Sequence, residues 1–226
     1  MQNPYGDHPY LNGHHAPNRF EADAPDLFVE GEIPRDLAGA FYHNGLEPLF
    51  PTRGDEYHCS DGDGMIYAFF IEDGSVSMHN RWVRTDKFEL ERAAGERLFS
   101  VFGNPLSRHP SVSGKRYNTA NTNVILDGGK LLALMEGAPA VELDPRDLST
   151  IGEEHYGGAI TSTFSAHPTM DHATGELINI GAIIHGPNGP AELRYDVIDA
   201  SGKLTKTEFI PVPHMSLMHT FLVTKN

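Results

Sequence analysis

The sequence predicts an all-β protein in which many short strands are joined by turns. Its 23 glycines and 16 prolines are spread along the 226 residues, a pattern that suits frequent turns better than long helices. Turn dipeptides such as Asp-Gly at 73–74 and Ser-Gly at 201–202 separate apolar runs that recur roughly every ten residues. This spacing is typical of a sandwich, a barrel or a propeller.

The individual elements follow from the same signals. Runs rich in β-branched, aromatic and aliphatic residues predict strands at 65–71, 76–84, 124–126, 131–135, 176–180, 192–197 and 205–211. Residues 87–99 differ, because they combine helix formers with mixed charge and predict a short helix. Residues 1–25 predict an irregular N-terminal arm. No linker divides the chain, so we expect a single domain over residues 1–226.

Charge and hydropathy exclude several classes of protein. The chain has 17 basic and 31 acidic residues and a formal net charge of −14, which argues against a nucleic-acid binder and against a polybasic membrane anchor. No run of 18 or more apolar residues occurs, so no transmembrane segment is expected. The first residues lack the basic start and apolar core of a signal peptide, and the single cysteine excludes an intrachain disulfide. We therefore expect a cytoplasmic protein.

Two of the thirteen histidines, His167 and His219, stand beside apolar residues. Pro168 holds His167 in an extended conformation at the start of a strand, and an apolar run follows His219. The two are 52 residues apart, close to the roughly 40–50 residues of a propeller blade. Equivalent positions in successive blades point at one axis, so both histidines could reach one metal ion. The alternative is that each is an ordinary core or surface histidine.

Each of these histidines has a competitor five residues away, namely His172 and His214. Residues five apart on a strand face opposite sides of the sheet, so only one of each pair can point inward. We favour His167 and His219 because apolar residues flank them.

Glu136 follows the apolar run at 131–135 and so ends a buried strand. It is either a carboxylate that faces water or one that accepts the second ring N–H of a metal-bound histidine. The Asp-Gly-Asp-Gly sequence at 61–64 resembles a calcium loop only faintly, since Met65 stands where that loop needs Asp or Asn. We interpret it as a tight turn.

Several motifs, in order along the chain, resemble the carotenoid cleavage oxygenases, a family that includes apocarotenoid, stilbene and lignostilbene dioxygenases. They are Asn-Pro-Tyr at 3–5, Asn-Gly-His-His-Ala-Pro at 12–17, Gly-Glu-Ile-Pro-Arg-Asp-Leu-Ala-Gly at 31–39, Asp-Gly-Asp-Gly-Met-Ile at 61–66, Arg-Trp-Val-Arg-Thr at 81–85, Asn-Thr-Ala-Asn-Thr-Asn at 118–123, Leu-Asp-Pro at 143–145, Ala-His-Pro at 166–168 and Met-His at 218–219. The resemblance covers nearly the whole chain.

The resemblance implies a seven-bladed β-propeller, of which this chain would form the incomplete N-terminal portion. In the family, four histidines on the propeller axis hold a non-haem Fe(II) ion and three glutamates support them. By its motifs, His167 resembles the first iron ligand and His219 the second, and Glu136 resembles a glutamate that accepts the N–H of His219. The implied reaction uses O2 to cleave a conjugated C=C bond into two carbonyl products.

The resemblance also suggests substrate contacts. In lignostilbene-type members a lysine and a tyrosine hold the phenolic hydroxyl of the substrate; Lys115 matches the lysine, whereas Trp82 occupies the position of the tyrosine. Trp82 could stack on a stilbene ring or line a tunnel for a polyene, and Lys115 could be a solvated turn residue. We favour stilbene or other phenylpropanoid substrates over apocarotenoids.

The sequence departs from the family at several points. Residues 43–48 read His-Asn-Gly-Leu-Glu-Pro in place of the usual Arg-Asn-Gly-Pro-Asn-Pro, Cys-Ser at 59–60 replaces an aromatic pair, and Thr220 replaces an aspartate. The third and fourth histidines have no counterpart. We therefore expect a fragment that is inactive alone and that self-associates through open strand edges. The alternative is a non-catalytic binding or scaffold protein derived from a propeller.

Overall fold

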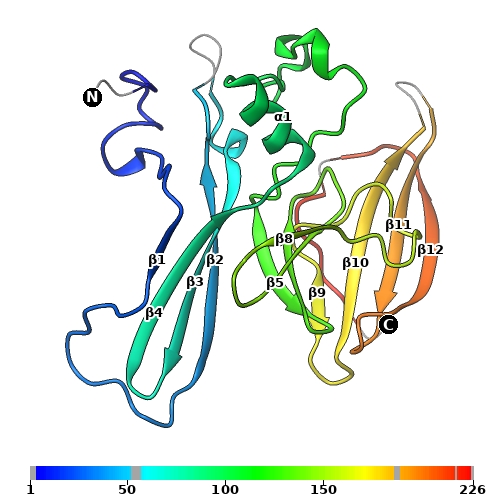
Figure 1. Cartoon of the computed structure of the whole chain (residues 1–226). Coiled ribbons are helices and arrows are strands. Elements are labelled where there is room, and N and C mark those ends of the chain that lie inside the picture. Colours follow the sequence, from blue (N-terminus) through cyan, green and yellow to red (C-terminus); the bar gives the residue numbers. More distant parts are fainter. Residues whose placement is uncertain (1–3, 52–56, 186–188, 217, 225–226) are drawn as a thin grey trace.

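A computed structural model of the chain describes residues 4–51, 57–185, 189–216 and 218–224 (Figure 1). These residues form three four-stranded antiparallel sheets and one α-helix, so the all-β prediction is confirmed. None of the helices in this described part is long and apolar enough to span a membrane. Short 3-10 helices lie at Gly13–His15, Cys59–Asp61, Pro105–Ser107 and Pro110–Val112.

The first sheet has the strand order β1-β4-β3-β2. Its strands are β1 (Ala22–Ala24), β2 (Gly39–Glu47), β3 (Asp63–Glu72) and β4 (Ser75–Trp82). The segment 1–25, which was expected to be irregular, therefore supplies the edge strand β1, which pairs with β4.

The second and third sheets each use four consecutive strands, in the orders β5-β6-β7-β8 and β12-β11-β10-β9. The second contains β5 (Asn123–Asp127), β6 (Lys130–Leu134), β7 (Val141–Leu143) and β8 (Thr150–Glu153). The third contains β9 (Thr169–Asp171), β10 (Glu176–Ile184), β11 (Ala191–Ile198) and β12 (Leu204–Val212). We call β2, β5 and β9 the inner strands; each is an edge strand of its own sheet.

Strand β6 joins the three sheets because its side chains alternate between two cores. Leu131 and Ala133 pack in a cluster shared with the first sheet, whereas Leu132 and Leu134 pack in a cluster shared with the third. All four side chains are fully buried. Alternation along a strand sends neighbouring residues to opposite faces, so the second sheet is buried on both faces.

Replacing Leu132 with alanine should lower the free energy of unfolding by about 2–5 kcal/mol, because the cavity left in this core cannot close fully. Urea unfolding followed by circular dichroism measures the effect. Leu126→Ala on the neighbouring strand is the matched control, since Leu126 is 58% exposed and should change stability by less than about 0.5 kcal/mol. Equal effects of the two changes would contradict the assigned core.

The α-helix is shorter than the predicted 87–99, so the prediction was wrong for the C-terminal part of that range. Helix α1 (Asp86–Ala94) ends at Gly95, whose φ of 73° lies in the left-handed region that favours glycine. Beyond that glycine, the carboxylate of Glu91 accepts both main-chain N–H groups at 98–99, each at 2.8 Å. These bonds hold the following residues on a non-helical path. Figure 1 shows α1 near one end of the sheets.

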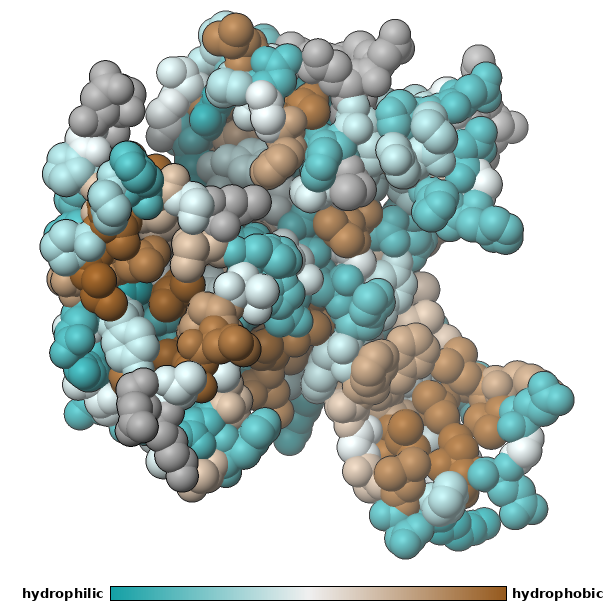
Figure 2. All heavy atoms as spheres, turned by 180° about the vertical axis from the view of Figure 1, so that it is seen from behind, coloured by the Kyte–Doolittle hydropathy of each residue, from teal (hydrophilic) through white to brown (hydrophobic). Residues whose placement is uncertain are grey.

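The first sheet exposes an apolar face on the side away from the second sheet. Phe41, Phe69 and Met78 stand opposite one another on three neighbouring strands, and Phe41 is 61% exposed. In Figure 2 this sheet forms the projecting part at the lower right, where brown apolar surface gathers. An exposed apolar face is typical of an interaction surface. The self-association that we expect through open strand edges stays a prediction.

Candidate metal centre

His167 lies two residues before the inner strand β9. Its main-chain N–H donates to the side-chain hydroxyl of Ser165 at 3.0 Å. The imidazole is half-buried, and its Nε2 atom lies 3.1 Å from Nε2 of His219. The two rings meet edge to face, with centroids 4.5 Å apart and planes at 70°.

His219 follows β12 but does not enter a strand, contrary to the expectation from its apolar neighbours. The described residues at 218–224 have no regular secondary structure. Its side chain is 58% exposed, so the approach to His167 does not result from burial of the ring. The structure thus brings together two histidines that are 52 residues apart in the chain.

Glu136 lies two residues after β6, and its Oε1 atom contacts Nδ1 of His219 at ion-pair distance. This oxygen is buried and has no partner of good hydrogen-bond geometry, so the contact with His219 is its one polar contact among the described residues. A carboxylate that accepts the Nδ1 proton of a histidine leaves the lone pair of Nε2 free to bind a metal ion, and Glu136 lies on the Nδ1 side of His219.

The three side chains fit a divalent transition metal. One ligand atom from each of Glu136, His167 and His219 lies within 4.8 Å of the others. With metal–nitrogen bonds of about 2.1 Å, two imidazole ligands at right angles have nitrogens about 3.0 Å apart, close to the 3.1 Å observed between the Nε2 atoms. Imidazole ligands suit iron, zinc, copper and nickel.

The competing histidines are not part of this cluster. His172 is exposed in the turn between β9 and β10, and His214 is exposed after β12. Neither belongs to a group of metal-ligating side chains among the described residues. The choice of His167 and His219 over these two therefore agrees with the geometry.

An apolar cavity of about 420 Å³ borders the cluster, because Glu136 forms part of its wall. Most of its other wall residues are large and apolar, among them Phe102, Tyr117, Met135, Phe164, Ile184 and Met218. A larger cavity of about 570 Å³ lies in the loops at 29–35 and 73–74, but its wall is mostly polar and carries no histidine. The cavity beside Glu136 is therefore the better candidate for an apolar ligand.

Neither residue expected to contact substrate lines this cavity. The Trp82 ring is buried against Met65 and Phe88, with ring centroids of Trp82 and Phe88 5.4 Å apart. It lies on the face of the first sheet opposite to Ile66, which packs against the second sheet. Lys115 is exposed in a turn that follows the 3-10 helix at Pro110–Val112.

Tyr117, two residues after Lys115, is the polar aromatic residue of the cavity wall that sequence reasoning missed. Burial raises the pKa of Tyr117 to about 12, and the nearby charge of Lys87 opposes this rise. This tyrosine stands in the Gly-Lys-Arg-Tyr sequence at 114–117, from which only the lysine was predicted to contact substrate.

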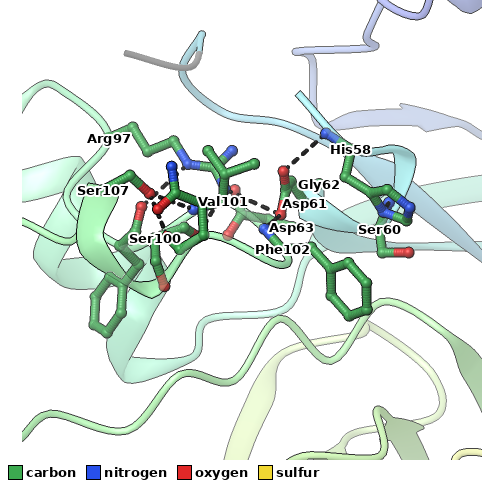
Figure 3. A network of polar contacts seen from close by, with 12 residues as sticks. His58, Ser60, Asp61, Gly62, Asp63, Arg97, Ser100, Val101, Phe102 and Ser107 are labelled. Carbon is green, nitrogen blue, oxygen red and sulfur yellow. Dashed lines mark hydrogen bonds and ion pairs between the residues drawn. The ribbon is translucent and has the colours of Figure 1, made fainter. Parts of the chain in front are cut away.

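Phe102 is held in the wall by a buried aspartate (Figure 3). Asp61 Oδ1 accepts the main-chain N–H of Phe102 at 2.8 Å and lies 3.3 Å from a guanidinium nitrogen of Arg97. The other carboxylate oxygen accepts the main-chain N–H of His58 at 2.9 Å. Asp61 thus organises the neighbouring loops. The expected tight turn at 61–64 was wrong, because Asp61 ends a 3-10 helix and β3 begins at Asp63.

Asp63, the first residue of β3, belongs to a buried ion cluster. Lys87 Nζ lies 2.6 Å from Asp63 and 2.8 Å from Glu91, and all three side chains are almost fully buried. Desolvation alone would lower the pKa of Lys87, but the two carboxylates outweigh it and raise the pKa to about 12. The cluster holds α1 against the first sheet. Because both carboxylates already pair with Lys87, they are not available to bind a metal cation.

Comparison with known proteins places these features in a family. The family model described as retinal pigment epithelial membrane protein matches residues 15–226. Isoeugenol monooxygenase of Pseudomonas putida is 41% identical over 220 residues, which are 96% of this chain and 45% of that protein. Lignostilbene-alpha,beta-dioxygenase isozyme III of Sphingomonas paucimobilis is 39% identical over 212 residues, 93% of this chain and 43% of that protein.

The crystal structure of Pseudomonas brassicacearum lignostilbene dioxygenase superposes with a TM-score of 0.91 and 34% identity, covering 98% of this chain and 46% of that one. The three sheets are therefore blades of the propeller of such enzymes, as predicted. The chain spans less than half the length of each of these relatives.

Proposed function

Because the chain belongs to the carotenoid cleavage oxygenase family, that of the retinal pigment epithelial membrane protein, we propose that it forms part of a non-haem Fe(II)-dependent dioxygenase. The substrate is a stilbene, another phenylpropanoid or an apocarotenoid. The observation that carries the proposal is the 3.1 Å separation of the Nε2 atoms of His167 and His219, beside an apolar cavity.

His167 and His219 would hold the Fe(II) ion through their Nε2 atoms, and Glu136 would hold the ring of His219 in place through Nδ1. When bound, the iron supplies the O2 chemistry that turns a C=C bond into two carbonyl groups, with one oxygen atom on each carbon. Neutral histidine ligands leave the full positive charge on the metal ion.

The cavity would bind and orient the substrate. Its aromatic and aliphatic wall favours a planar apolar molecule and excludes water from the reacting bond. Tyr117 would form part of the aromatic wall against which a phenolic substrate lies. For Lys115, exposed and two residues away, we keep the proposal of a contact with that end of the substrate. For Trp82 the buried position supports a role in the core instead.

We propose that further ligands of the iron belong to regions of the relatives that these 226 residues do not match. The chain spans about 45% of the isoeugenol monooxygenase, and its described part offers two histidines at the site. The isolated chain should then bind Fe(II) but cleave its substrates very slowly. Product formation by the purified chain, loaded with Fe(II) and given O2 with isoeugenol or a hydroxylated stilbene, would contradict this.

Glu136→Gln tests the metal site itself. We expect the variant to bind Fe(II) about 10–100-fold more weakly than the parent chain, since the amide cannot hold the Nδ1 proton of His219 as firmly. Anaerobic titration calorimetry measures both affinities. Glu192→Gln is the matched control, because Glu192 pairs with the exposed His185 at 3.0 Å and is not part of the cluster. Equal affinities for all three proteins would refute the role of Glu136.

A further inference from the structure

Three hydrogen bonds hold the main chain that leads into His167. The N–H of Ser165 donates to the side-chain oxygen of Asn179 at 2.8 Å. The N–H of His167 donates to the hydroxyl of Ser165 at 3.0 Å. The side-chain amide of Asn123 donates to the carbonyl oxygen of Ala166 at 2.9 Å. The peptide unit that joins Ala166 to His167 is therefore bound by side chains at both its carbonyl and its N–H, and the N–H of Ser165 is bound by a third.

The anchor from the third sheet is itself rigid. Asn179 is fully buried, and its amide nitrogen donates to Asp196 at 2.9 Å, which sets the direction of its oxygen toward Ser165. Arg194 donates to the same aspartate oxygen at 2.9 Å and to the carbonyl of Thr163 at 2.6 Å. Buried polar groups whose partners are all in place have little freedom to reorient. The loop before His167 is thus clamped by its own sheet.

The anchor from the second sheet links the inner strands. Asn44 on β2 donates its side-chain amide to the carbonyl oxygen of Asn123 on β5 at 2.9 Å. Asn123 in turn donates to Ala166, just before β9. An asparagine side chain thus donates a hydrogen bond from β2 to β5, and another donates from β5 to the Ala166 carbonyl. The residue that follows Ala166 is His167. The position of its main chain is therefore set by the second sheet as well as by the third.

We infer that Asn123 and Ser165 are positioning residues for His167. Their two hydrogen bonds hold the carbonyl and the N–H of the one peptide unit that joins Ala166 to His167, where the His167 ring meets that of His219 with 3.1 Å between Nε2 atoms. This inference rests on the proposed function, in which His167 binds the metal. In this role each residue acts through the main chain and is not a ligand of the metal, although Ser165 also forms part of the cavity wall.

Asn123→Asp is the sharpest test, since it keeps the shape of the side chain and replaces the amide donor with a carboxylate that repels the Ala166 carbonyl. Ser165→Ala is a second variant, which removes the acceptor of the His167 N–H. Asn18→Asp is the matched control, because Asn18 donates its amide to the Tyr67 hydroxyl at 2.9 Å in the first sheet.

Two readouts separate positioning from general stability. Hydrogen exchange with mass spectrometry reports the main-chain amides at 163–170 in the metal-free chain, and anaerobic Fe(II) calorimetry reports the affinity. We expect faster exchange at 163–170 and about tenfold weaker Fe(II) binding in both test variants, as is typical for the loss of a group that orients a ligand. Exchange elsewhere in the chain should remain that of the parent, and Asn18→Asp should leave both readouts at 163–170 unchanged.

Parental exchange and parental affinity in both variants would overturn the inference. If exchange rises throughout the chain in Asn123→Asp alone, that variant has lost general stability. The Ser165→Ala variant then decides, because the loss of one hydroxyl leaves the sheets intact. If the parent chain itself binds no Fe(II), the proposed function fails, and the exchange at 163–170 alone then decides whether Asn123 and Ser165 hold the His167 peptide.

Discussion

Replacing His167 with alanine is expected to weaken Fe(II) binding by this chain more than about 100-fold, a larger loss than that from removing a supporting carboxylate. His167 supplies one of the two Nε2 atoms that converge at 3.1 Å, and no other histidine in the described residues lies in the cluster to replace it. Anaerobic calorimetry with the parent and variant chains measures the loss, and His219→Ala should give the same result.

His172→Ala is the matched control for this experiment. It removes an exposed imidazole five residues away, in the turn after β9, and should leave the Fe(II) affinity unchanged. Equal losses for His167→Ala and His172→Ala would show that Fe(II) binds to surface histidines without a defined site. Binding that survives both His167→Ala and His219→Ala would remove the metal centre from the proposed function.

Lys87→Met should destabilise the fold by about 3–5 kcal/mol at pH 7, because it leaves the buried carboxylates of Asp63 and Glu91 without their cation. Methionine keeps much of the volume of the lysine stem, so the loss comes mainly from the unpaired charges. Urea unfolding gives the free energies of the parent and variant chains. Lys206→Met is the matched control, since Lys206 pairs with Glu208 on the exposed surface of β12 and should change stability by less than about 1 kcal/mol.

The same pair of proteins should show a characteristic dependence on pH. The pKa of Lys87 is raised from 10.5 to about 12 in the folded state, so the folded chain retains this proton more firmly than the unfolded chain. The contribution of the shift, about 2 kcal/mol, is fully present below pH 10.5 and is lost as the pH rises through 12. The difference in stability between the parent and Lys87→Met should therefore shrink over this window.

Tyr117 also has its pKa raised to about 12, and it does not cancel fully from the difference, because the charge of Lys87 lowers this pKa and Lys87→Met removes that charge. A difference between the parent and Lys87→Met that stays constant up to pH 12 would contradict the charged state assigned to Lys87.

The strands that were predicted from the sequence are those with strong apolar patterns. The predicted 65–71 lies within β3 and the predicted 176–180 within β10. Strand β2 was not among the predictions, since it contains two glycines and the polar pair His43 and Asn44. Its pairing with β3 along nine residues compensates for that weak local preference.

The residues of the candidate site also fall into those that the sequence predicted and those that it did not. Spacing and resemblance pointed to His167, His219 and Glu136, because these residue types stand out in an apolar context. The cavity wall was not predictable, because its members come from distant segments. Phe102, for example, owes its place to a carboxylate 41 residues earlier in the chain.

The sequence by itself determined the all-β class, most strands and the residues able to bind a metal, because alternation, turn residues and side-chain chemistry are local properties. The tertiary structure decided which of these side chains meet. Packing of the second sheet against both neighbours, together with the asparagine contacts between inner strands, sets the positions of the segments that carry Glu136 and His167. Such positions depend on long-range packing and on the twist of each sheet, and no local pattern in the chain encodes them.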